Sequence, residues 1–144
     1  MAEQILIKQG EGKDFDYSQD HCYVKLPFKV TGNCSMVEDT MKPGFYLPRH
    51  HHKIMTEVFY MLEGDFELIY DNKTIHLKPG DTAIVPPNVW HIGKSDKGGK
   101  MITVFVNGRF DEYLEKMSKL TEADFADAEK MKAINAEYDI YNED

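Results

Sequence analysis

The chain has 144 residues, of which 42% are hydrophobic and 29% charged, and its formal net charge is -8 at pH 7. This length allows one sizeable hydrophobic core, and no apolar run approaches the roughly 18 residues that a membrane helix requires. Residues 109–144 hold 11 acidic and 5 basic side chains, and because Lys and Arg form no cluster we expect neither nucleic acid nor a membrane surface as a partner.

The amino-terminal stretch and the two cysteines indicate a reducing compartment. Ile5, Leu6 and Ile7 are only three consecutive apolar residues, whereas a secretory signal contains roughly 7 to 15. A cytoplasmic location is therefore expected. In that compartment Cys22 and Cys34 are expected to be reduced and partly buried rather than joined in a disulfide.

Residues 22 to 107 divide into short segments rich in Val, Ile, Phe, Tyr and Thr, separated by Gly, Pro, Asn and Asp. This pattern is typical of short antiparallel strands. In the last segment, 101–106, strand alternation places Met101, Thr103 and Phe105 on one face and the residues between them on the other. Such strands must close on themselves or stack in two sheets to remove their edges. We therefore predict a small all-β barrel or sandwich.

After Arg109 the spacing of apolar residues changes from two to the 3.6 of a helix. The apolar positions 110, 113, 114, 117 and 120 predict a first amphipathic helix. Thr121 and Asp124 resemble a capping box, which predicts a second helix through about Asn135. The apolar line of this second helix is Phe125, Ala128, Met131 or Lys132, and Ile134. We expect residues 1–108 to form the barrel with its N-terminal strands and residues 109–144 to form a two-helix extension packed on it.

The segment RHHHKIMTEVFYMLEG, residues 49–64, contains three consecutive histidines followed by a lone glutamate. Alternation along a strand sends His50 and His52 to one face and His51 to the other. Glu57 can join the first pair at the start of the next strand, and the turn at 86–88 returns His91 to the sheet. The alternative is a solvated loop, since exposed histidine is common.

Three imidazoles and one carboxylate suit a borderline divalent ion and suit calcium or magnesium poorly. We expect one such ion per chain, from the set Fe, Mn, Ni, Cu, Co and Zn. In a six-coordinate ion this donor set leaves two positions open for water, dioxygen or a chelating substrate, so the ion can take part in chemistry.

The spacing of these residues resembles the two signature motifs of the cupin superfamily. The first reads Gly44, five residues, His50, one residue, His52, four residues, Glu57, six residues, Gly64; the second reads Gly80, five residues, Pro86, one residue, Asn88, two residues, His91. The resemblance covers residues 44–91 closely and, through the rhythm of the strands, about 22–107. It implies a double-stranded β-helix, the cupin jelly-roll barrel, with His50, His52, Glu57 and His91 as metal ligands.

Two positions depart from the second cupin motif. Asn88 stands where the family normally has glycine, and Ser95 stands where it often has asparagine. Asparagine tolerates a positive φ better than other non-glycine residues, so we expect the turn to survive. Ser95 is not a ligand position, and all four donor positions are intact.

The pleat predicts which apolar side chains share the interior with Glu57. If Glu57 points inward, Phe59 and Met61 do so too. Further candidates for the same interior are Phe66, Leu68, Tyr70, Met101 and Phe105. This lining favours an apolar or aromatic small molecule, although for each residue taken alone core filling is the better explanation. His21 and His76 match no motif position and are expected at the surface.

A looser resemblance concerns function. The segment VTGNCSMVEDTMKPG and the acidic tail are similar to those of small single-domain cupins grouped with quercetin 2,3-dioxygenases. This implies a metal-dependent dioxygenase acting on an enol-type, flavonol-like substrate, with Glu57 as ligand and catalytic base. The alternatives are a non-catalytic small-molecule or metal-binding module and a cupin isomerase. Because segment 101–106 is apolar on both faces, we also predict a homodimer.

Overall fold

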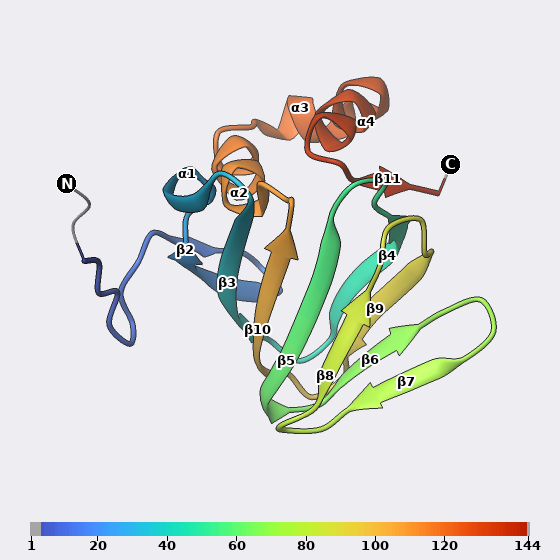
Figure 1. Cartoon of the computed structure of the whole chain (residues 1–144). Coiled ribbons are helices and arrows are strands. Elements are labelled where there is room, and N and C mark those ends of the chain that lie inside the picture. The colour runs from blue at the N-terminus through green and yellow to red at the C-terminus, as the bar shows by residue number, and fades with distance from the viewer. Residues whose placement is uncertain (1–3, 144) are drawn as a thin grey trace.

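The computed structural model describes residues 4–143, which form mainly two antiparallel β-sheets (Figure 1). The first sheet contains, in spatial order, β1 (Asp14–Asp16), β2 (Asp20–Leu26), β3 (Cys34–Met41), β10 (Gly99–Val106), β5 (Thr56–Gly64) and β8 (Thr82–Val85). The second contains β11 (Tyr141–Asn142), β4 (Phe45–His51), β9 (His91–Ser95), β6 (Phe66–Ile69) and β7 (Thr74–Leu77).

From β3 to β10 the chain passes repeatedly between the two sheets, so that strands distant in sequence become neighbours. A core cluster fills the space between the inner faces: Met41, Phe45, Phe59, Met61, Phe66, Leu68, Leu77, Ala83, Val85 and Met101. Both sheets contribute to this cluster, as a closed roll requires. The predicted all-β barrel with C-terminal helices is confirmed.

Strand β10 shows the predicted alternation. Met101, Thr103 and Phe105 are buried, whereas Ile102 and Val104 are half-buried on the outer face. In register, Phe105 lies opposite Glu57 of β5, so the inward face of this sheet carries polar and apolar residues together. The pleat therefore brings Glu57 into the interior with the apolar residues expected beside it.

The helices within residues 4–143 are α1 (Phe28–Thr31), α2 (Phe110–Ser118), α3 (Glu122–Ala126) and α4 (Ala128–Glu137). The first predicted tail helix corresponds to α2, and Thr121 forms the expected capping box with Asp124. A continuous second helix from Thr121 to Asn135 is wrong. Asp127 is extended, with φ -88° and ψ 96°, and its side chain accepts a hydrogen bond from the Lys130 N–H, so it ends α3 and caps α4.

The apolar line predicted for the second tail helix is also only partly correct. Ile134 is buried, whereas the Phe125 side chain is 47% exposed. The break at Asp127 explains this difference, because residues on either side of it no longer follow one helical period.

A second apolar cluster closes one end of the roll. Leu114 of α2 and Ile140, after α4, pack against inward-facing residues of the first sheet, and Figure 1 shows the helices gathered at this end. The chain then forms β11, in which Tyr141 pairs with His51 and Asn142 pairs with His50. The segment after Arg109 is thus not purely helical. Met1 to Glu3 and Asp144, which the predicted boundaries include, lie outside the described residues.

Two further features bear on the sequence predictions. Cys22 is buried, Cys34 is half-buried, and both are free thiols. Among residues 4–143, no helix is both long enough and apolar enough to cross a bilayer.

Candidate metal centre

Four side chains from three strands meet between the two sheets, and one of them, His52, follows directly after the end of β4. His50 lies near the end of β4, Glu57 follows the start of β5, and His91 begins β9 directly opposite His50. The exposed fractions are 8% for His50, 3% for His52, 4% for Glu57 and 1% for His91. These values exclude the solvated-loop alternative.

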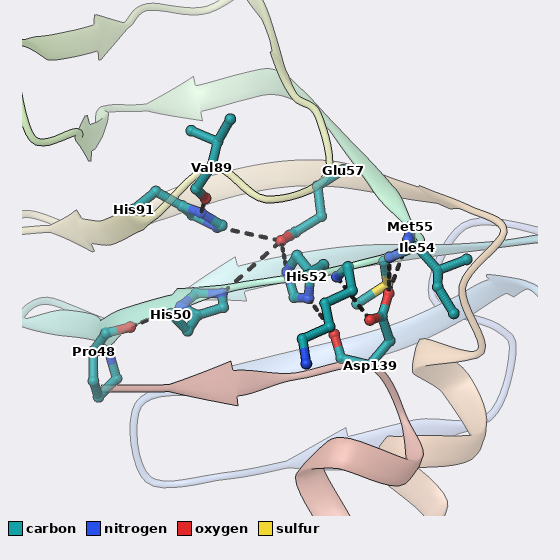
Figure 2. A network of polar contacts seen from close by, with 10 residues as sticks. Pro48, His50, His52, Ile54, Met55, Glu57, Val89, His91 and Asp139 are labelled. Atoms are coloured by element: carbon teal, nitrogen blue, oxygen red, sulfur yellow. Dashed lines mark hydrogen bonds and ion pairs between the residues drawn. The ribbon is translucent and has the colours of Figure 1, made fainter. Parts of the chain in front are cut away.

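The four donor groups converge on one point. Glu57 Oε1 lies 3.9 Å from His50 Nε2 and 3.4 Å from His91 Nε2, and it is in direct contact with His52 Nε2. The four donor atoms all lie within 4.8 Å of one another. Figure 2 shows Glu57 reaching into the space between the three rings. All four residues predicted from the sequence are therefore brought together.

Backbone carbonyls fix the orientation of the three imidazoles. Each Nδ1 lies against a carbonyl oxygen: Pro48 at 2.7 Å for His50, Asp139 at 2.7 Å for His52 and Val89 at 2.9 Å for His91 (Figure 2). A carbonyl only accepts, so each Nδ1 must donate. This assigns the ring tautomer and turns every Nε2 toward Glu57, as in histidines that bind metals.

The arrangement fits a cation at the centre. With Nδ1 protonated, a neutral imidazole presents a lone pair at Nε2, and lone pairs facing a buried carboxylate repel it. His91 Nε2 is buried and makes no hydrogen bond to any residue in 4–143. An unpaired buried acceptor is costly, and a divalent ion ligated by three imidazoles and a carboxylate would satisfy all four donors.

The pKa values also favour a donor set ready to bind a metal. Burial lowers the pKa of His50 to about 4, so this ring is neutral at pH 7. Burial alone would raise the pKa of Glu57, but the hydrogen bond from His52 and the nearby His91 ring hold it well below its usual range. Burial also disfavours a charged His52, yet the contact with Glu57 outweighs this and raises its pKa. In the metal-free site His52 is therefore protonated, and its positive charge takes over part of the role of a metal ion beside Glu57.

The turn before His91 connects the two sequence motifs. Asn88 has φ 67°, in the left-handed region, as expected for a residue that replaces glycine there. Its backbone N–H donates to the carbonyl oxygen of His52 at 2.6 Å. The prediction that asparagine preserves this turn is confirmed, and the hydrogen bond ties the second motif to the first.

Asp139 is a positioning residue that the sequence did not reveal. Its backbone carbonyl accepts the His52 Nδ1–H, and its carboxylate accepts the backbone N–H groups of Lys53 at 2.8 Å, Ile54 at 2.9 Å and Met55 at 2.8 Å. The residue itself has φ 64°. Figure 2 shows it below the strand that carries His50. Its only sequence signal is an aspartate shortly after a helix, which is common in proteins.

The remaining histidines lie away from the centre. His51 faces the opposite side of β4 from His50, and its ring packs 4.2 Å from that of Trp90 and 5.4 Å from that of Tyr141. His76 is exposed, as expected. His21 is half-buried and contacts Asp14 at 2.8 Å.

A cavity of about 200 Å³ adjoins the centre. His50, His52 and Glu57 line it, together with three of the predicted interior residues, Phe59, Met101 and Phe105. The other predicted interior residues, Met61, Phe66 and Leu68, fill the adjoining core, and Tyr70 is half-buried against it. The sequence analysis missed several polar residues that also line the cavity, among them Asp20, Cys22 and Asp39.

Comparison with known proteins gives consistent matches. A family model described as a cupin domain matches residues 37–107. Quercetin 2,3-dioxygenase of Bacillus subtilis (strain 168) is 31% identical over 118 residues, which are 81% of this chain and 35% of that protein. The chain thus spans about a third of the length of this relative.

Two solved structures resemble the fold. An RmlC-like cupin from Shewanella frigidimarina NCIMB 400 has 25% sequence identity and a TM-score of 0.65, over 77% of this chain and 96% of that one. KdgF from Halomonas sp. has 19% identity and a TM-score of 0.66, over 75% of this chain and 99% of that one. The second likeness concerns the fold alone.

Proposed function

This chain belongs to the cupin superfamily, and from that starting point we propose that it is a metal-dependent dioxygenase for a small enol-type substrate. The observation that supports this most directly is the convergence of three imidazole Nε2 atoms on one ionised carboxylate beside a small cavity lined partly by aromatic side chains. The similarity to quercetin 2,3-dioxygenase supports the same reaction class.

The proposed ligands are His50, His52, Glu57 and His91, which would hold one ion of Fe, Mn, Ni, Cu, Co or Zn per chain. A bound ion would supply Lewis acidity and open coordination positions. Glu57, whose pKa is held low, stays ionised and is the proposed base for the substrate hydroxyl proton. Phe59, Met101 and Phe105 exclude water from the substrate's ring.

The size of the cavity limits the substrate. An apolar cavity of about 150 Å³ accommodates one benzene molecule, so 200 Å³ is room for a single substituted ring. A flavonol has three rings and would require the cavity to open. We therefore propose that the preferred substrate is a single-ring enol or enediol. Such a compound keeps the enol group of the flavonol-like substrate expected from the sequence but is small enough for the cavity.

The test is oxygen uptake by protein that has been stripped with a chelator and reloaded with one metal at a time. With iron, manganese or nickel, single-ring hydroxypyranones are expected to drive oxygen consumption at least about 100-fold faster than the stripped protein. A Clark electrode measures the rate, and mass spectrometry with labelled dioxygen shows whether both atoms enter the product. Tight binding of these compounds with no uptake for any metal would instead support the non-catalytic module, and rearranged product without uptake would support an isomerase.

We also propose that the active form is a homodimer built on the outer face of the first sheet. Register places Val58 beside Val104 and Ile84, and Tyr60 beside Ile102, which makes a continuous apolar patch. The exposed fractions are 43% for Tyr60 and 63% for Ile84. In Figure 1 the helices lie at one end of the sheets, so they leave this face open. A patch of this kind is typical of an interaction surface.

Sedimentation equilibrium should give about twice the 16.7 kDa of one chain. Tyr60→Lys, which places a charge in the patch, is expected to weaken the dimer at least tenfold, because a buried lysine without a partner is costly. Leu6→Lys is the matched control, since Leu6 is 76% exposed and lies outside the patch. A wild-type monomer at micromolar concentration would contradict the proposal.

A further inference from the structure

A second buried polar cluster lies in the same cavity as the metal centre. Asp20 and Cys22 follow one another on the inward face of β2, and Asp39 lies opposite Cys22 on β3. Their exposed fractions are 9% for Asp20, 2% for Cys22 and 7% for Asp39. The Cys22 thiol donates to Asp20 Oδ2 at 3.3 Å. Within residues 4–143 neither carboxyl group has an ion pair with a basic side chain, so burial of the pair is uncompensated by positive charge.

One oxygen of this cluster has no partner. Asp39 Oδ1 is buried and makes no hydrogen bond to any residue in 4–143, although Asp39 lines the cavity. A buried polar atom without a partner costs folding free energy. Such atoms are typical of places where a ligand supplies the missing hydrogen bond.

The protonation state of the pair follows from its surroundings. Burial, reinforced by the negative charge of Asp20, raises the pKa of Asp39 to about 9. Among the titratable groups around the pair, burial raises the pKa of Cys22 and raises the pKa of Tyr17 to about 12. Tyr113, whose pKa burial also raises to about 12, lines the same cavity, as do His50, His52 and Glu57. At neutral pH Asp39 is therefore protonated and faces the negative charge of Asp20.

The cluster and the metal centre are far enough apart to contact opposite ends of one small molecule. Phe105 pairs with Glu57 on β5, whereas Met101, four residues away, pairs with Asp39 on β3. Asp39 is thus two strands across and four residues along from Glu57, which puts their Cα atoms on the order of 15 Å apart. Thr103 and Phe59 line the cavity between them.

We propose that Asp39 and Asp20 form the second binding site of this cavity and hold a hydroxyl or amino group at the end of a ligand whose other end binds the metal centre. The inference rests on the proposed function in placing that first end at His50, His52 and Glu57. A hydrogen-bond donor satisfies Asp39 Oδ1, whereas a carboxylate at the same end is repelled by the negative charge of the pair. The site therefore selects hydroxylated or amino-substituted rings and rejects their acids.

Three hydroxypyranones test this selection. Kojic acid, allomaltol and comenic acid share one enol-ketone chelating edge and carry, at the same ring position, a hydroxymethyl, a methyl and a carboxylate group. Calorimetry with zinc-loaded protein in the absence of oxygen is expected to show kojic acid binding at least tenfold more tightly than allomaltol, a difference of about 1.4 kcal/mol. Comenic acid is expected to bind more weakly than either. Because nothing is turned over, these ratios are independent of whether the chain is a dioxygenase.

Replacing both Asp20 and Asp39 by asparagine removes the negative charge of the pair while keeping the shape of both side chains. It is expected to reduce the preference for kojic acid over allomaltol to less than threefold and to improve comenic acid binding at least tenfold. Glu38→Gln is the matched control, because Glu38 neighbours Asp39 on β3 but lies on the other face of the sheet, outside the cavity lining. It should leave all three affinities unchanged.

The pH dependence of stability checks the same pair in metal-free protein. The pKa of Asp39 in the folded protein, about 9, lies above that of an unfolded aspartate, so the folded state holds the proton more tightly. The stabilisation of the folded state by this proton is fully present below about pH 4 and is lost as the pH rises toward 9. The melting temperature of Asp39→Asn relative to wild type is therefore expected to increase between pH 5 and pH 9, by about 5 °C.

Three results would overturn the proposal. The first is equal affinity for kojic acid and allomaltol, or binding of neither, in wild-type protein. The second is an unchanged ratio in the double variant Asp20→Asn and Asp39→Asn. The third is a second metal ion per chain that Asp39→Asn removes, because the cluster would then be a metal site and the oxygen of Asp39 a ligand.

Discussion

Replacing both His52 and His91 by alanine is expected to lower the affinity for a divalent transition ion by more than about 100-fold. Loss of a single outer partner of a ligand already costs about 10-fold to 100-fold, and this double variant loses two of the four proposed donors. Elemental analysis of wild-type protein should show about one ion per chain, and the variant should show almost none. Titration calorimetry with zinc gives the ratio of affinities.

His51→Ala is the matched control for this experiment. His51 belongs to the same run of three histidines, but its ring packs against Trp90 and Tyr141 on the other face of β4. It should therefore retain the ion with wild-type affinity. An equal loss of metal from His51→Ala and from the double variant would show that the histidine run binds metal as a surface cluster, and the buried centre would then be the wrong interpretation. Circular dichroism of each variant verifies that the roll is still folded.

The part of the site that follows strand geometry could be predicted from the sequence. Alternation of side chains with a period of two placed His50 and His52 on one face and His51 on the other. The same rule predicted the buried set in β10, and the conformational preference of asparagine predicted the backbone of Asn88. These features depend on local geometry, and fixed motif spacing supplied the return of His91.

The rest depends on contacts between residues far apart in the chain. Asp139 reaches the loop at 53–55 across more than 80 positions, and β11 pairs with β4 over a similar separation. Asp20 and Asp39 looked like ordinary charged residues in strands, because alternation alone does not tell which face of a strand becomes the interior. The break at Asp127 shows the same limitation locally, since an aspartate is equally compatible with a helix surface and with a cap.

The contact between Asp139 and the loop at 53–55, which follows His52, allows the second large effect to be predicted. Asp139→Asn is expected to weaken metal binding about 10-fold to 100-fold and to lower the free energy of unfolding by about 1 to 3 kcal/mol. The carboxylate accepts three backbone N–H groups, from Lys53, Ile54 and Met55, using both oxygens. An amide has one oxygen, so at least one of these N–H groups would face an NH₂ donor.

The substitution isolates the hydrogen bonds because asparagine tolerates the positive φ of residue 139 as well as aspartate does. Asp127→Ala is the matched control for stability, since it removes the cap of α4 at a cost of about 1 kcal/mol and touches no part of the centre. Calorimetry with zinc and thermal unfolding of the metal-free proteins separate the two effects. If Asp139→Asn and Asp127→Ala lost the same stability and both kept wild-type metal affinity, the His52 ring would not depend on Asp139. If only Asp139→Asn lost metal affinity, Asp139 would have two roles. Its carboxylate would hold the loop, and through this its backbone carbonyl would orient the His52 ring.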